Sequence, residues 1–376
     1  MKFIYICLLP LLLFSCLKKE QSTASSTDPR NSKDKTAVAY RLQDEISIQV
    51  PVDHQTDPVD AKSSQDSADD IAIWVDDQNP EHSRIIGTHK KYGLYLFEAS
   101  GKKITDYPFG KINNVDVRQG VVFGQDTLDI VAGSNRTDNS ILWLQMRNDA
   151  LLKLTDHAQK VSPLIDDAYG FCLYHDLKNQ KLYAFVNGKN GNIEQYLLNK
   201  NESGFTHRLV RRLKVDSQPE GMVVDDRTHR LYIGEENVGV WYADARAEAS
   251  DSLTMIAQSR VAENQFIVAD IEGLAIYPQG SEGGLLFLSI QGNFSYAVFD
   301  LQTNKYINSF KLTDGLVDGV EETDGIELTT AQLIPGMDRG VLIAQDGFNM
   351  EQDSMVAQNF KLVSVGKILE ALSISL

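Results

Sequence analysis

Residues 218–226 read QPEGMVVDD, and the same pattern, a polar or acidic residue leading directly into a short apolar run, occurs five more times. The six leading residues are Asp70, Asn114, Tyr169, Glu220, Glu272 and Asp324. Successive members are 44, 55, 51, 52 and 52 residues apart. A period of this length, built from short β-type segments, is typical of a propeller with one four-stranded sheet per blade. We therefore predict an all-β fold, a six-bladed β-propeller.

The segments inside one period support this prediction. In the fourth period, EGMVVDD is expected to form the inner strand, RLYIGEE the second and GVWYAD the third. All three are short, rich in β-branched and aromatic residues, and separated by turn residues. The segment EISIQV, at residues 45–50, precedes the first period. We expect it to pair with the last blade and close the ring, which removes exposed strand edges.

The first 40 residues are expected to lie outside the propeller. Residues 1–15 resemble a signal peptide, because the apolar run FIYICLLPLLLF is too short to span a membrane. The following LFSC ends at Cys16 and resembles a bacterial lipobox, in which the cysteine is lipidated. Residues 16–40 are strongly polar and predict a flexible tether. The propeller, at residues 41–376, would then hang from the bacterial cell envelope on its periplasmic or cell-surface face.

Charge and cysteine content narrow the possible partners. The 376 residues include 52 acidic and 36 basic ones, a formal net charge of -16. This balance argues against nucleic acid and against polybasic membrane adhesion, so only the N-terminal lipid is expected to touch a membrane. Besides Cys7 and Cys16 the chain has only Cys172, so no internal disulfide is expected. A monomer is expected.

The repeated acidic residues predict a cation site. A Glu-Gly or Asp-Gly pair alone is ordinary turn chemistry. These acids, however, share one position on strands that converge on an axis, and further acids lie nearby. Clustered carboxylates repel one another unless a cation neutralises them, and oxygen-only ligands favour calcium over zinc or copper. The additional acids are Glu236, Asp270 and Asp318.

Basic residues alternate with these acids. Lys90 and Lys91 occur in THKKYG, Arg136 in GSNRTD and Lys189 in VNGKNG, each just after an expected second strand. Two other periods have Glu235 and Gln291 at this place. A mouth that is half acidic and half basic suits a polyanion held partly by Lys and Arg and partly through bridging metal ions.

A dozen segments in register resemble the β-propeller phytases, the calcium-dependent alkaline phytases of bacteria. They include DDIAIWV, THKKYGL, INNVDVR, YGFCLYH, QPEGMVVDD, IGEEN, DIEGLAIY, SIQGNFSYAVFD and AQDGFN. The resemblance implies a phosphomonoester hydrolase of the 3-phytase type that releases phosphate from calcium phytate (myo-inositol hexakisphosphate). It implies direct attack of a calcium-activated water, no phosphoenzyme, and several Ca2+ ions.

The resemblance also implies roles for particular residues. Lys90, Lys91, Arg136 and Lys189 would bind the substrate phosphates, with Tyr169 beside them at the catalytic centre. Glu220 would lie nearest to the attacking water. The metal ligands implied are Asp70, Glu220, Glu236, Asp270, Glu272, Gln291, Asp318 and Asp324. The chain departs from the family at Asn190, where an acid is usual, and at Asp70-Ile71, where Asp-Pro is usual.

Two other functions are compatible with a six-bladed propeller that binds calcium. A six-bladed calcium-dependent lactonase would not need the basic set. A non-catalytic calcium-binding envelope propeller that binds a glycan or a protein would release no phosphate with any metal.

Overall fold

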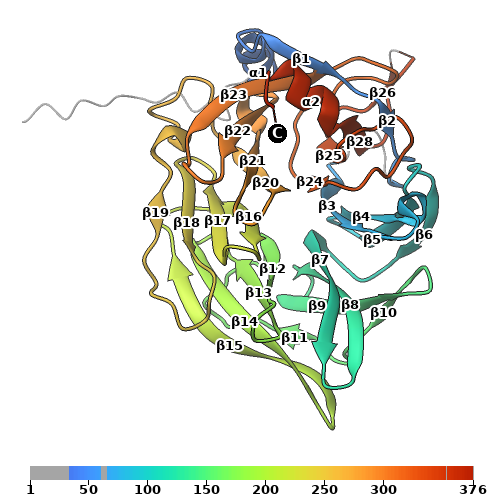
Figure 1. Ribbon diagram of the computed structural model, residues 1–376, viewed down its shortest axis with the longest axis vertical. Coiled ribbons are helices and arrows are strands. Elements are labelled where there is room, and N and C mark those ends of the chain that lie inside the picture. Colours follow the sequence, from blue (N-terminus) through green and yellow to red (C-terminus); the bar gives the residue numbers. More distant parts are fainter. Residues whose placement is uncertain (1–33, 61–65, 353, 376) are drawn as a thin grey trace, which may run out of the picture.

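Six small β-sheets surround a central axis in the computed structural model, which describes residues 34–60, 66–352 and 354–375 (Figure 1). The six-bladed propeller is therefore confirmed. The predicted signal peptide and Cys16 lie outside the described residues. Most of the predicted tether does too, but its last residues form part of helix α1 (Lys35–Gln43), so ordered structure begins before residue 41.

Within each blade the strands from the innermost outward follow one another in the sequence and pair antiparallel, and blades five and six each gain one outer strand from the N-terminal chain. The predicted strand order of the fourth period is confirmed. Blade one contains β3 (Ala68–Trp74), β4 (Arg84–His89), β5 (Gly93–Glu98) and β6 (Lys103–Tyr107). Blade two contains β7 (Ile112–Phe123), β8 (Asp126–Asn135), β9 (Ser140–Arg147), β10 (Ala150–Lys153) and the short β11 (Gln159–Lys160). Blade three contains β12 (Phe171–Asp176), β13 (Lys181–Asn187), β14 (Asn192–Asn201) and β15 (Gly204–Lys214).

The second half of the ring follows the same order. Blade four contains β16 (Pro219–Asp225), β17 (Arg230–Glu235), β18 (Gly239–Asp244) and β19 (Thr254–Met255). Blade five contains β20 (Ile271–Gln279), β21 (Gly283–Ile290), β22 (Ser295–Asp300), β23 (Tyr306–Thr313) and β1 (Ile48–Pro51). Blade six contains β24 (Ile326–Thr329), β25 (Val341–Asp346), β28 (Asn359–Ser364) and β2 (His54–Gln55), and the hairpin β26 (Met350–Glu351)–β27 (Ser354–Met355) interrupts it.

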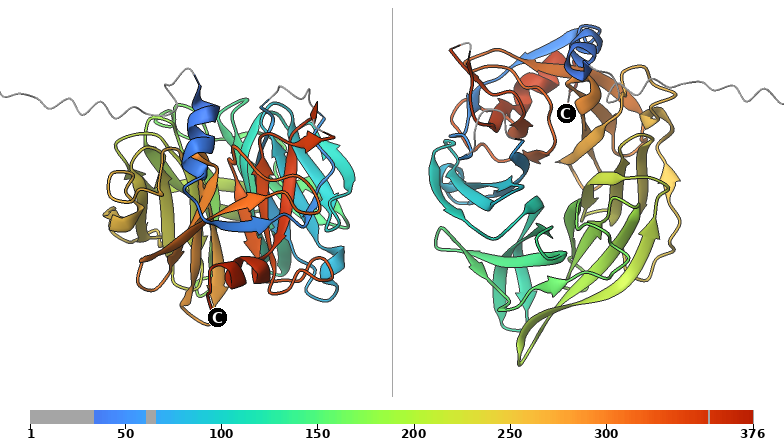
Figure 2. Two further views of the ribbon diagram at one scale, coloured as in Figure 1. Left: turned by 90° about the horizontal axis from the view of Figure 1, so that it is seen from above. Right: turned by 180° about the vertical axis from the view of Figure 1, so that it is seen from behind.

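The ring closes differently from the prediction. Strand β1 pairs with β23 of blade five, in parallel, with Ile48 opposite Phe310. It is the next strand, β2, that pairs with β28 of blade six, with His54 opposite Leu362. Helix α1 explains the order, because it is fixed to blade five before β1 begins: Gln43 donates a 3.0 Å hydrogen bond to the carbonyl of Phe294. The N-terminal chain thus reaches blade five first and then crosses to blade six (Figure 2).

Apolar side chains hold neighbouring blades together. Within the described residues, six buried apolar clusters occur, and each lies between two successive blades. The cluster between blades five and six also includes helix α2 (Val365–Ala371), which buries Val365, Ile368 and Leu369. The described residues also form three short 3-10 helices: η2 (Pro80–His82), η3 (Ala257–Ser259) and η4 (Gln291–Asn293). No helix in the described ranges is long and apolar enough to cross a membrane.

A local irregularity at the start of the inner strands brings polar side chains to the axis. In blades one, two, four and five the inner strand shifts register at its first residues, between Ala68 and Ile71 in blade one and between Pro219 and Met222 in blade four. Such a bulge redirects one side chain and bends the strand. In blade four the second residue of the bulge is Gly221, and a Cβ there would lie 2.0 Å from the carbonyl oxygen of Glu272. Adjacent inner strands therefore approach too closely for any side chain at this position.

We predict that Gly221→Ala lowers Tm by at least about 5 °C, because the added methyl group would push against the backbone of the next blade. Gly234, on the adjacent strand β17, is the matched control, since its nearest contact for a Cβ is 3.4 Å, an ordinary van der Waals distance. Thermal unfolding of both variants measures the difference. Equal Tm values for Gly221→Ala and Gly234→Ala would contradict the close-packing argument.

Candidate active site and metal centre

The inner strands begin around a polar cavity of about 440 Å³ on the axis, here called the axial mouth. Ten of the predicted site residues line it: Lys90, Arg136, Tyr169, Lys189, Glu220, Glu236, Asp270, Glu272, Gln291 and Asp324. The structure thus brings together residues from all six blades, as the repeat predicted.

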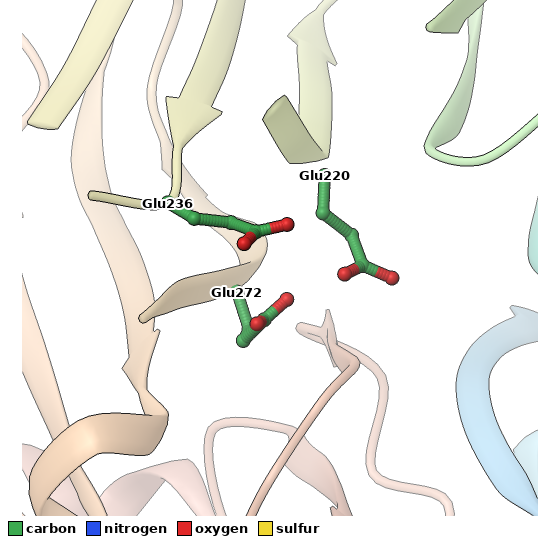
Figure 3. A group of neighbouring side chains, drawn as sticks. All are labelled: Glu220, Glu236 and Glu272. Atoms are coloured by element: carbon green, nitrogen blue, oxygen red, sulfur yellow. The ribbon is translucent and has the colours of Figure 1, made fainter. Parts of the chain in front are cut away.

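Three buried carboxylates form the centre of the acidic half. Glu220 on β16, Glu236 just after β17 and Glu272 on β20 each offer an oxygen, and these oxygens lie within 4.8 Å of one another (Figure 3). Burial, followed by the negative charge of Glu220, raises the pKa of Glu272 well above its usual range. Oε2 of Glu272 and Oδ1 of Asp69 are buried and have no hydrogen-bond partner among the residues that the structure describes. These unsatisfied oxygens, in a site whose donors are carboxylates and amides, fit a hard cation such as calcium.

Lys90 acts as an internal counter-ion in the mouth. Its Nζ lies 2.6 Å from Asp66, 2.8 Å from Asp324 and 3.2 Å from Asp69. Burial alone would lower the pKa of this ammonium group, but the carboxylates of Asp324, Asp69 and Asp66 raise it well above its usual value. Burial has the opposite effect on a carboxyl group, and it raises the pKa of Asp324 to about 6. Gln291 adds a neutral donor, with a 2.5 Å hydrogen bond from Nε2 to Asp324 Oδ1.

The basic half is built around Tyr169. The ammonium group of Lys189 lies 4.1 Å from the centre of its ring, and the guanidinium carbon of Arg136 lies 5.5 Å from it. Asp167 fixes Arg136 through Nε, at 3.0 Å, and through Nη2, at 2.7 Å. Two cations therefore lie against the same aromatic ring, whose quadrupole favours positive charge over its faces.

The sequence predicted that Asp70 and Asn114 line the mouth, but neither of them does. They line a second cavity of about 340 Å³ between the inner strands, together with Asp116, Arg118 and Glu327. The residues that line the mouth are instead their predecessors, Asp69 and Asn113. The sequence explains the difference: blades three to six have a glycine directly after the mouth residue, whereas blades one and two have the polar residues Asp70 and Asn114 in that position.

Two further predicted residues are not among those that line the mouth. Lys91 is exposed beside it. Asp318 lies in a separate ion-pair cluster, where the fully buried Lys361 approaches it to 2.5 Å and Asp346 to 3.2 Å. Asp318 therefore does not line the mouth in the part of the chain that the structure describes, and its role as a metal ligand stays a prediction. Asn190 also does not line the mouth, and its side chain donates to the carbonyl of Leu164.

Sequence reasoning missed several residues of the mouth. Asp69 and Asn113 could have been found from the glycine that follows the polar residue in the other four blades. The remaining ones come from loops and from outside the repeated position, where no sequence signal marked them: Asp66, Gln218, Glu322, Gln345 and Gln358.

We predict that Asp70→Asn changes how stability depends on pH. Burial raises the pKa of Asp70 to about 7, so its charged form is disfavoured in the folded state. Its contribution to stability is fully present below the unfolded pKa, about 4, and is lost as the pH rises through 7. With a chelator present, wild type should therefore lose on the order of a few kcal/mol relative to Asp70→Asn between pH 4 and pH 8.

Denaturant unfolding at several pH values measures this difference, with Asp149→Asn as the control. Asp149 is 58% exposed and pairs with Arg84 at the surface. Parallel stability curves for wild type and Asp70→Asn would contradict the prediction.

Three comparisons relate the chain to known proteins. A family model described as Phytase matches residues 22–376. A protein named 3-phytase from Bacillus subtilis (strain 168) is 39% identical over 341 residues, which cover 89% of this chain and 88% of that protein. A solved structure of a luciferin-regenerating enzyme aligns with a TM-score of 0.51 and 11% identity, covering 82% of this chain and 96% of that one. At this identity the last likeness concerns the fold alone.

Proposed function

This chain belongs to the phytase family, and we propose that its axial mouth is where phosphate is released from phytate in the presence of calcium. The protein is a phosphomonoester hydrolase acting on phytate. The comparisons therefore disfavour the two alternative functions, a lactonase and a non-catalytic propeller. One observation supports the assignment of the site above all others: the same mouth contains a buried carboxylate cluster and three cationic side chains.

Arg136 and Lys189 are suited to hold phosphate oxygens. The contacts of Arg136 with Asp167 and Asn113 use three of its five N–H donors, which leaves two for a ligand. Within the described chain, Lys189 forms no ion pair, so its ammonium group is available above Tyr169. Lys90 is held by carboxylates, and it would reach a phosphate once another cation neutralises them. These groups would bind a polyanion through charge-assisted hydrogen bonds.

The carboxylates would hold calcium. Glu220, Glu236 and Glu272 are the nearest set, with Asp270, Gln291 and Asp324 around them. Calcium bound there would neutralise these acids, shield the charge of the phosphate and make a nearby water a better nucleophile.

Glu220 is the best candidate to accept the proton of the attacking water. It belongs to the acidic cluster and is linked to the basic half, because it accepts a 2.9 Å hydrogen bond from Asn113, which in turn accepts one from Arg136. In the proposed step the water oxygen bonds to phosphorus, the bond from phosphorus to the inositol oxygen breaks, and the proton of the water passes to Glu220. The leaving inositol oxygen takes up a proton from Glu220 or from solvent to give the alcohol, which restores the enzyme. No phosphoenzyme forms. Positioned acceptors of this kind commonly contribute about 100-fold or more in rate.

We predict that Glu220→Gln lowers kcat on phytate by about 100-fold, because the amide keeps the shape but cannot accept the proton. Arg136→Ala should instead raise KM and lower kcat, since it removes a phosphate contact. Steady-state kinetics, with and without calcium, test both variants, and Asp149→Asn is the control. Near-normal turnover by folded Glu220→Gln would show that another residue accepts the proton of the attacking water.

The lipobox-like sequence LFSC at residues 13–16 leads to a second proposal, that a lipid on Cys16 holds the enzyme at the cell envelope. Cys16→Ser should then move the protein from the membrane fraction to the soluble fraction without loss of activity, because the lipid is attached outside the propeller. Fractionation and a phosphate-release assay measure both effects. A wild-type protein found wholly in the soluble fraction would disprove the anchor.

A further inference from the structure

We propose that Asn113 is a positioning residue that aligns Glu220 with Arg136, so that the proton acceptor and the phosphate-binding guanidinium group face the same phosphate. This inference rests on the proposed function. Asn113 lies in the bulge of β7 in blade two, and its side chain is fully buried.

The contacts of the Asn113 amide join the two halves of the mouth. Its Nδ2 donates to Oε1 of Glu220 at 2.9 Å, and its Oδ1 accepts from Nη1 of Arg136 at 3.2 Å. Nδ2 also donates to Oδ1 of Asn114 at 3.0 Å, which fixes the plane of the amide. A single side chain from blade two therefore connects the carboxylate of blade four to the guanidinium group of its own blade.

Only one orientation of the amide satisfies both partners. A guanidinium group has donors alone, so it must meet the oxygen, and a carboxylate has acceptors alone, so it must meet the nitrogen. Aspartate at position 113 would keep the acceptor for Arg136 but would place a second carboxylate against Glu220. An alanine would leave both partners without their buried hydrogen bond, which costs more than the bond itself contributes.

The position of Asn113 in the ring also favours alignment over metal binding. Equivalent positions in the other blades have Asp69, Tyr169, Glu220, Glu272 and Asp324. Blade two alone places a neutral amide there, and both ends of that amide already have partners. The backbone of Glu220 is fixed as well, because its carbonyl accepts from Nδ2 of Asn187 at 3.0 Å. Glu220 is thus held at its backbone by blade three and at its side chain by blade two.

The experiment compares wild type, Asn113→Ala and Asn113→Asp in steady-state kinetics on phytate, in calcium titration by calorimetry without substrate, and in thermal unfolding. Asn199→Ala is the matched control: its amide donates to the carbonyl of Leu197 on β14, outside the mouth. Removal of groups that orient catalytic or metal-binding residues typically costs about 10- to 100-fold.

Asn113→Ala is expected to lower kcat by about 10- to 100-fold and to raise KM, since both Glu220 and Arg136 lose their partner. Asn113→Asp is expected to lower kcat comparably but to leave KM within about threefold, because Arg136 keeps its acceptor. The added carboxylate should also tighten calcium binding in the calorimeter. A merely structural role would lower Tm and the active fraction while leaving KM and calcium affinity unchanged.

The inference is overturned if both folded variants retain kcat, KM and calcium affinity within about twofold of wild type. Should either variant fail to fold, the smaller polar change Asn113→Ser is measured against the same criteria. A wild-type protein without phosphate release at any calcium concentration would instead count against the proposed function. The calorimetric comparison still tests the link between Asn113 and Glu220 in that event.

Discussion

Electrostatic repulsion among the carboxylates that the inner strands bring to one axis is the constraint on which the site depends. Charges a few ångströms apart interact strongly where water is scarce. The chain reduces this repulsion by three means: the Lys90 ammonium group between Asp66, Asp69 and Asp324, amide donors such as Gln291, and raised pKa values of buried carboxyls such as Glu272. Eight carboxylates line the mouth together with only three cationic side chains, and this excess of negative charge suits a bound cation such as calcium.

The strands cannot relieve this repulsion by moving apart. Their backbones touch where the inner strands begin, because Gly170 and Gly221 each leave room for less than a methyl group beside the next blade. The apolar clusters between successive blades fix the spacing from outside. An axis crowded with like charges is therefore kept in place by packing some distance away, and the geometry of the site follows from the rigidity of the ring.

The repeat in the sequence was sufficient to predict the six blades and most of the mouth, because position along an inner strand decides which side chains meet at the axis. It failed where the backbone departs from regular alternation. Asp70 and Asn114 stand at the second residue of their bulges, where blades four and five have glycine, so Asp69 and Asn113 line the mouth instead. Asp318 pairs with Lys361 outside the mouth. The alignment role of Asn113 was not predictable either, since it depends on the direction of an amide between two partners.

The two N-terminal strands that complete blades five and six have a consequence for how the chain is made. Their partners, β23 and β28, are synthesised more than 250 residues later, so the segment at 48–55 remains without its native neighbours through nearly all of translation. Contacts between residues so distant in the chain slow folding. The ring of blades can therefore close only after the last blade has been synthesised. Until then, a nascent or truncated chain has open sheet edges that can pair with another molecule.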